Sequence, residues 1–70
     1  MIDVTKLTES DKGREVRYTS HGKIEYGKIA SWNDYYVFVR YHTAIENGKT
    51  RHRIGETSEA TSPITLEFTE

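Results

Sequence analysis

The residues best suited to chemistry in this chain are its three histidines, His21, His42 and His52. Imidazole can transfer protons near neutral pH, and it is a common zinc ligand. His42 and His52 lie on either side of a predicted hairpin turn and could oppose each other across it, with Glu46 close in sequence. Two histidines without a third well-placed ligand make a weak zinc site, and the chain has no cysteine. We therefore expect solvated histidines and no metal site.

The other side chains that could act as nucleophiles or acids lack a recognisable frame. Five serines are scattered through the chain, and none lies in a nucleophile elbow: Ser10, Ser20, Ser31, Ser58 and Ser62. Glu56 and Glu59 could pair as carboxylates, but they fall in a polar stretch where nothing would desolvate them and raise a pKa. The sequence therefore predicts neither an enzyme nor a bound cofactor.

Charge is unevenly distributed along the chain. The net charge is −1, but residues 12–53 hold nine Lys or Arg against four acids, a local balance of +5. Beside several aromatic side chains, this segment could bind nucleic acid through a basic hairpin made of Arg40, His42, Lys49, Arg51 and Arg53. Strand alternation would place Arg51 and Arg53 on the face opposite His52 and so divide the set. We keep nucleic-acid binding as the alternative function.

A cluster of aromatic residues at a predicted turn is the second candidate site. Its members are Trp32, Asn33, Asp34, Tyr35 and Tyr36. Large aromatic side chains at a turn are good anchors for a protein partner. The competing interpretation is that Trp32 and Tyr36 close one end of the fold as part of the core.

The elements that must position these residues are short β-strands. Runs of β-branched and aromatic residues are separated by turn residues about every ten positions, which is typical of an all-β domain. We expect strands over residues 14–19, 24–32, 35–41, 50–54 and 64–69. Asn47-Gly48 is the strongest hairpin signal, and Gly27 is a candidate bulge. The strand over 35–41 is apolar on both faces and belongs at the centre of the sheet.

The order of these elements predicts a small five-stranded SH3-like barrel. Four strands form an antiparallel meander, and a single 3₁₀ turn around residues 58–60 precedes the closing fifth strand. Residues 1–70 form one domain, with residues 1–12 as a lead-in whose Leu7 docks on the barrel and whose Thr8 caps a turn through Asp11. Because a chain this short is only marginally stable alone, a partner or a homo-oligomer would stabilise it.

Three segments of the chain resemble small uncharacterised proteins of tailed bacteriophages and prophages. They are Leu7-Thr8-Glu9-Ser10-Asp11-Lys12-Gly13-Arg14, the run from Gly27 to Tyr41 (GKIASWNDYYVFVRY), and Glu59-Ala60-Thr61-Ser62-Pro63-Ile64-Thr65-Leu66-Glu67-Phe68. The resemblance covers most of the chain except residues 43–55. It implies an accessory or host-modulating role in a bacterial cytoplasm, and it assigns no catalytic or binding residues.

Two further features bear on location. Residues 1–10 carry Asp3, Lys6 and Glu9 and lack the pattern of a signal peptide, and no apolar stretch approaches the length of a membrane span. We therefore expect a cytoplasmic protein that does not contact a membrane. Taken together, the sequence favours a non-catalytic barrel that binds a protein partner.

Overall fold

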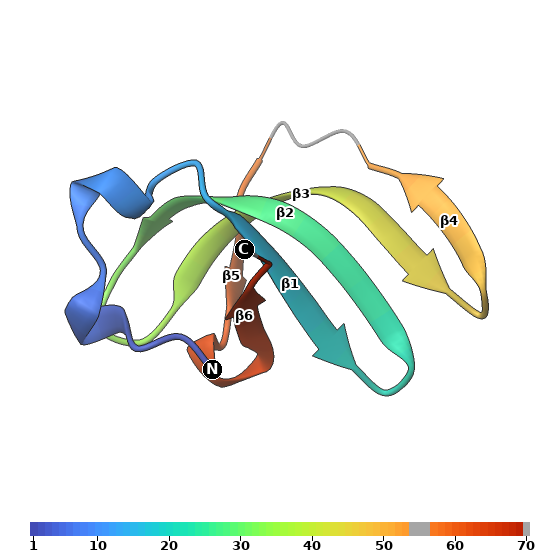
Figure 1. Cartoon of the computed structure of the whole chain (residues 1–70), viewed down its shortest axis with the longest axis horizontal. Helices are drawn as coiled ribbons and strands as arrows, with labels where there is room; N and C mark the ends of the chain where they lie inside the picture. Colours follow the sequence, from blue (N-terminus) through green and yellow to red (C-terminus); the bar gives the residue numbers. More distant parts are fainter. Residues whose placement is uncertain (54–56, 70) are drawn as a thin grey trace.

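The chain folds into one antiparallel β-sheet of six strands (Figure 1). This computed structural model describes residues 1–53 and 57–69. The strands are β1 (Glu15–Ser20), β2 (Lys23–Trp32), β3 (Val37–Glu46), β4 (Lys49–His52), β5 (Glu59–Thr61) and β6 (Leu66–Phe68). Three single 3₁₀ turns accompany them, η1 (Val4–Lys6), η2 (Glu9–Asp11) and η3 (Pro63–Thr65). The all-β prediction is confirmed, and none of the described segments is a helix that could span a membrane.

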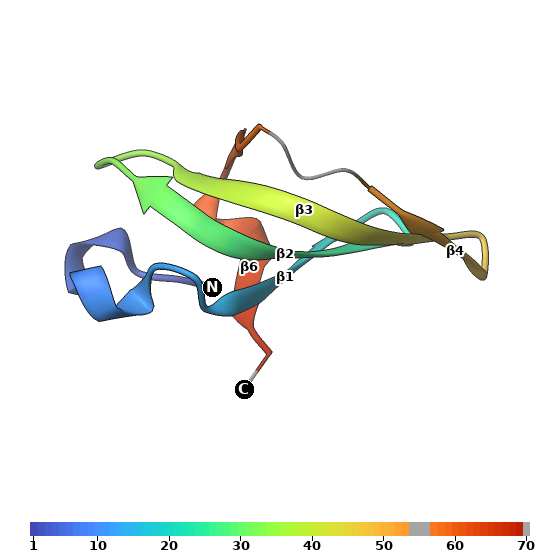
Figure 2. The ribbon, with the colours of Figure 1, turned by 90° about the horizontal axis from the view of Figure 1, so that it is seen from above.

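The sheet is open at both ends. Its order is β4-β3-β2-β1-β6, and β5 pairs with a separate stretch of β3. Figure 2 shows the C-terminal segment crossing from the β3 side of the molecule to the β1 side. The sequence predicted five strands in a closed barrel; the structure has six strands, and β4 and β6 are not hydrogen-bonded to each other.

Strand alternation separates an inner, core-facing side of the sheet from an outer side. The inner face carries the buried core residues of three strands, and Leu66 of β6 and Ile2 of the lead-in cover them: Val16, Ile29, Val37, Val39 and Tyr41. The residues between these positions point to the outer face. β3 lies between β2 and the pair β4 and β5, so the prediction of a central third strand is confirmed.

The C-terminal segment differs from its predicted layout. Residues 59–61 form strand β5 and pair with Val37–Val39, where the sequence predicted a 3₁₀ turn. The 3₁₀ turn lies later, in η3, because Pro63 at its start has a fixed φ and no N–H to contribute to a strand. Ile64 is 72% exposed as a result, so the predicted alternation of Ile64 with Leu66 is wrong.

The β3–β4 hairpin is longer than predicted on the β3 side. β3 begins at Val37 instead of Tyr35 and continues to Glu46, and the hairpin closes through Asn47 (φ 52°) and Gly48 (φ 75°). This is the geometry expected of an Asn-Gly turn. The predicted end of the fourth strand, Ile54, lies outside the described residues.

The register of this hairpin corrects the predicted pairing of two histidines. His52 lies opposite Thr43, and the carbonyl of His42 accepts a hydrogen bond from the N–H of Arg53 at 2.9 Å. His42 and His52 are therefore offset by one position across the turn. A shift of one residue reverses the face to which a side chain points, which is why small errors in offset matter.

Gly27 sits at a register shift between β2 and β3, as the predicted bulge requires. A Cβ atom at this position would lie 2.5 Å from the backbone oxygen of Arg40 and 2.6 Å from Cγ1 of Val39. The two strands can approach this closely only because residue 27 has no side chain.

The N-terminal lead-in packs against the core. Asp11 accepts hydrogen bonds from the N–H of Thr8 at 2.8 Å and from its hydroxyl at 3.3 Å, so the predicted cap is confirmed. Leu7 packs against the core cluster as predicted. Ile2 is also buried, and its N–H donates to the carbonyl of Pro63 at 2.9 Å, which ties the lead-in to η3.

Candidate functional site

The loop from Asn33 to Tyr36 joins β2 to β3 and is fixed by one side chain. The Oδ1 atom of Asn33 accepts the N–H of Tyr35 at 2.8 Å and the N–H of Tyr36 at 2.7 Å. The N–H of Asn33 donates to the carbonyl of Tyr36 at 2.9 Å. Three hydrogen bonds within four residues hold the backbone of this turn in one conformation.

The turn presents its aromatic side chains unequally. Tyr35 is 76% exposed and Tyr36 is 48% exposed. Trp32 is half-buried and packs against the core cluster, and the Nζ atom of Lys12 lies 5.9 Å from its ring centroid. We define Asn33–Tyr36 as the tyrosine turn. Trp32 supports it from below, while the two tyrosines face solvent.

The predicted basic hairpin is divided between the two faces of the sheet. Arg40 lies between the buried residues Val39 and Tyr41, so its side chain points to the outer face. Arg51 is registered with the inner-facing Ala44. Lys49 alternates in the same way as Arg51, so these two cations lie on the opposite side from Arg40.

Arg53 is occupied by carboxylates of its own chain. Its Nη1 atom lies 2.6 Å from Oε1 of Glu25, and its Nη2 atom lies 3.0 Å from Oε1 of Glu59. Hydrogen bonds to Glu59 and Glu25 raise the pKa of this guanidinium. The Glu25 side chain is only 9% exposed, so Arg53 compensates a carboxylate that would otherwise be costly to bury.

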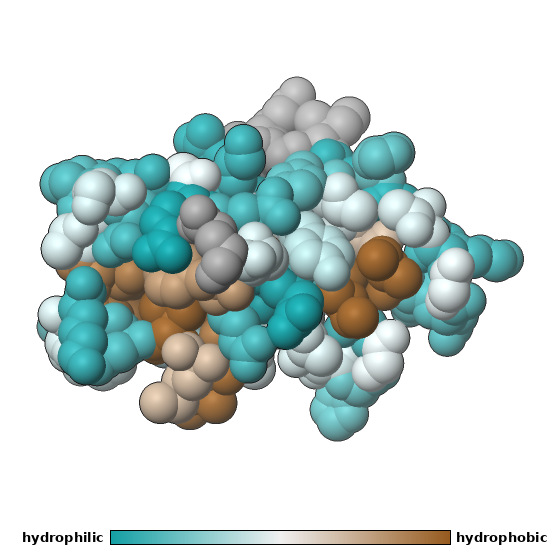
Figure 3. Space-filling view, in the orientation of Figure 1, coloured by the Kyte–Doolittle hydropathy of each residue, from teal (hydrophilic) through white to brown (hydrophobic). Residues whose placement is uncertain are grey.

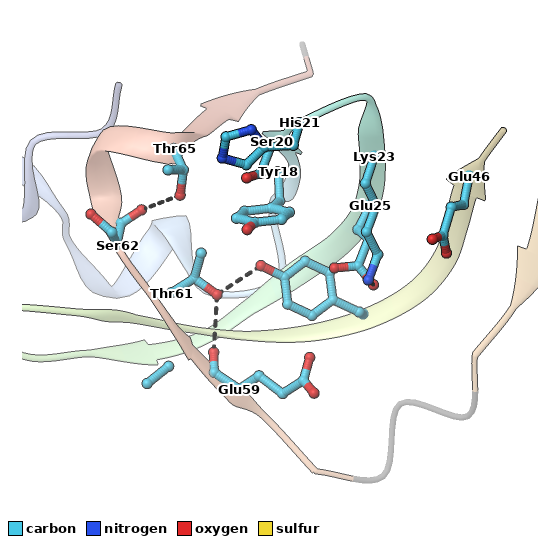
Figure 4. Close-up of a pocket in the computed structure, with 12 residues that line it drawn as sticks. Tyr18, Ser20, His21, Lys23, Glu25, Glu46, Glu59, Thr61, Ser62 and Thr65 are labelled. Atoms are coloured by element: carbon cyan, nitrogen blue, oxygen red, sulfur yellow. Dashed lines mark hydrogen bonds and ion pairs between the residues drawn. The ribbon is translucent and has the colours of Figure 1, made fainter.

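A groove of about 640 Å³ opens beside this ion cluster (Figure 4). The rings of Tyr18 and Tyr41 meet edge to face in it, with centroids 6.2 Å apart. The Tyr41 hydroxyl and Thr61 Oγ1 share a hydrogen bond of 2.7 Å, and Thr61 also donates to the carbonyl of Glu59. Burial raises the pKa of Tyr41 to about 12, so its phenol is protonated at neutral pH.

The groove is polar, and its hydroxyl groups are used by the fold. Thr65 Oγ1 donates to the carbonyl of Ser62 at 2.7 Å, and Thr61 is engaged by Tyr41. No three His, Asp or Glu side chains among residues 1–53 and 57–69 are grouped to hold a metal ion. The arrangement offers hydrogen bonds and charge to a bound surface, with no nucleophile placed beside a base in the described part of the chain.

Lys28 is a cation that sequence reasoning did not select. It lies directly opposite Arg40 on the neighbouring strand, between the buried residues Gly27 and Ile29, and its side chain therefore shares the outer face. The alternation of Ile24, Tyr26 and Lys28 in β2 could have signalled this, but the register with β3 depends on the bulge at Gly27.

Comparisons of the chain with protein-family models, with curated proteins and with solved structures found no match.

Proposed function

We propose that this protein is a non-catalytic binding module whose tyrosine turn anchors a protein partner. The observation that carries the proposal is the pair of exposed tyrosines, Tyr35 and Tyr36, on a backbone fixed by Asn33. Tyrosine is enriched among residues that dominate interface energies. A preorganised turn also loses little conformational entropy when it binds.

The surrounding fold supports this use. Trp32 packs against the core directly below the turn, so the two tyrosines project from a rigid base. Ile64 is nearly as exposed as Tyr35, but it stands on η3 without a neighbouring exposed aromatic residue. Clustered aromatic anchors, rather than isolated apolar side chains, are typical of protein-binding surfaces.

We further propose that the domain is a variant of the SH3-like barrel. This is supported by a 3₁₀ turn, η3, between two strands that pair with β3 and with β1. The additional strand β4 would then be an insertion between the third and fourth barrel strands. The resemblance to bacteriophage proteins points to an accessory or host-modulating factor acting in a bacterial cytoplasm.

The test is quantitative affinity capture from a bacterial lysate with three tagged baits. They are the wild type, the double variant Tyr35→Ser/Tyr36→Ser, and the control Ile64→Ser, which removes a similarly exposed apolar side chain elsewhere. We expect a partner that is captured by the wild type and by Ile64→Ser and is lost with the double variant. A partner retained at full yield by the double variant, or none captured by any bait, would reject the proposal.

Nucleic-acid binding through residues 40–53 is the weaker proposal. It needs Arg40, Lys49, Arg51 and Arg53 to act together, but alternation separates Arg40 from Lys49 and Arg51. Glu25 and Glu59 already neutralise Arg53. The basic hairpin therefore offers fewer free cations on one face than its sequence implies.

A further inference from the structure

A shallow depression on the outer face collects three basic side chains. It has a volume of about 430 Å³ and is lined by Gly13, Lys28, Ile29, Ala30, Arg40 and His42. Lys28 and Arg40 are cross-strand neighbours, so their charged ends lie on the same side of β2 and β3. Two like charges at this spacing repel each other unless an anion lies between them.

The cations of this depression are not neutralised by the described part of the chain. Lys28 and Arg40 form no ion pair with any residue of 1–53 or 57–69. The Nε2 atom of His42 is buried and has no hydrogen-bond partner there, although Oε2 of Glu15 lies 3.5 Å away. A buried polar atom without a partner indicates a group that a ligand can satisfy.

Aromatic side chains flank the cations along the same face. Phe38 precedes Arg40 by two positions on β3, and Tyr26 precedes Lys28 by two positions on β2. Because the strands are antiparallel, one ring lies to each side of the cation pair, about 7 Å away along the sheet. Both rings are half-buried. The face seen in Figure 3 is mostly hydrophilic, with hydrophobic areas separated by polar ones.

We infer that Lys28, Arg40 and His42 form a site for a phosphate group in the backbone of single-stranded nucleic acid. The cations would hold the phosphate, and bases on either side would stack on Tyr26 and Phe38. This site is independent of the tyrosine turn and of the basic hairpin, since Lys49, Arg51 and Arg53 take no part.

Acidic residues near the site set the direction of a second test. Glu15 is registered with Lys28 and lies beside His42, so its carboxylate competes with a phosphate for the same groups. The next acid on this face, Glu67, is paired with Arg17 at 2.8 Å. Removing the charge of Glu15 should therefore strengthen anion binding.

The experiment measures anisotropy of a fluorescein-labelled oligothymidylate at several salt concentrations. For two phosphates neutralised by Lys28 and Arg40, log K should fall with log salt at a slope of about −1.4. Arg40→Gln should weaken binding about fivefold or more and reduce the slope to about −0.7. The matched control Arg51→Gln makes the same charge change on the inner face and should bind like the wild type.

Two further arms separate this proposal from its competitors. Glu15→Gln should bind the oligonucleotide more tightly, and Tyr26→Thr should bind it more weakly while keeping the salt slope. Inorganic phosphate, followed by the NMR shifts of His42, should bind far more weakly than the oligonucleotide. No measurable oligonucleotide binding, equal losses in Arg40→Gln and Arg51→Gln, or inorganic phosphate binding as tightly as the oligonucleotide would overturn the inference.

Discussion

Tyr41 joins the sheet to the C-terminal segment through a single hydroxyl. Its ring is buried in the core, and its hydrogen bond to Thr61 fixes the end of β5. Because the folded state favours the neutral phenol, the pKa of Tyr41 rises from 10 to about 12. The unfolded chain therefore loses this proton first as the pH increases.

The consequence is a defined loss of stability in alkali. The contribution of Tyr41 is complete below pH 10 and disappears as the pH rises through 12, a change of about 2 to 3 kcal/mol in the free energy of unfolding. Urea unfolding at a series of pH values measures it. Tyr41→Phe should lose about 1 kcal/mol at neutral pH and show a smaller decline between pH 10 and 12. An equal alkaline decline in both proteins would contradict this assignment.

Gly27 shows how one missing side chain sets the distance between two strands. Gly27→Ala places a methyl group against the backbone of Arg40, so we expect unfolding to become easier by about 1 to 3 kcal/mol. Lys28→Ala, at the neighbouring exposed position, should change stability by less than about 0.5 kcal/mol. Thermal melting of both variants checks this, and equal melting temperatures would show that the strands can separate without cost.

At the scale of elements, the sequence located strands and turns whose signals are local. The Asn47-Gly48 turn, the bulge at Gly27 and the cap at Thr8 each depend on residues close in the chain, and all three are present. Strand β5 was missed because its three residues, Glu59–Thr61, carry no alternating pattern. They pair with β3 through contacts far apart in sequence, which propensity cannot reveal.

The candidate sites were predictable to different degrees for the same reason. Asn33 and its neighbours were selected because a turn and its aromatic residues adjoin in sequence. The division of the basic residues between faces depends on register, and the ion pairs of Arg53 join residues as distant as Glu25. Lys28 was missed because its partner Arg40 becomes visible only when β2 and β3 are aligned.

The β3–β4 hairpin gives an element-scale prediction. Gly48 has φ 75°, and no atom would lie within 4 Å of a Cβ added there, so only backbone strain opposes a larger residue. Gly48→Val should destabilise the protein by about 1 to 2 kcal/mol, because a β-branched residue rarely adopts this φ. Gly48→Asn should cost less, since Asn tolerates the left-handed region. Equal melting temperatures for the two variants would place the strain elsewhere.

At the scale of the whole molecule, distinct surfaces serve distinct partners. The tyrosine turn lies at the opposite end of the long axis from the β3–β4 hairpin (Figure 1), in a molecule of 34 × 23 × 21 Å. The inner side of β4 carries Lys49 and Arg51, and the outer face carries Lys28 and Arg40. A net charge of −1 thus conceals local surfaces of opposite character. A protein partner at the turn would leave the outer face accessible.

The most direct test of the tyrosine turn is site-specific photocrosslinking in bacterial cells. A p-benzoylphenylalanine residue replaces Tyr35 in one protein and Ile64 in another, since both positions are exposed to a similar degree. We predict that irradiation joins the Tyr35 protein to one partner of discrete mass and that the Ile64 protein gives no such product. Crosslinks to the same partner from Ile64 alone, or no crosslink from position 35, would contradict the role of this turn.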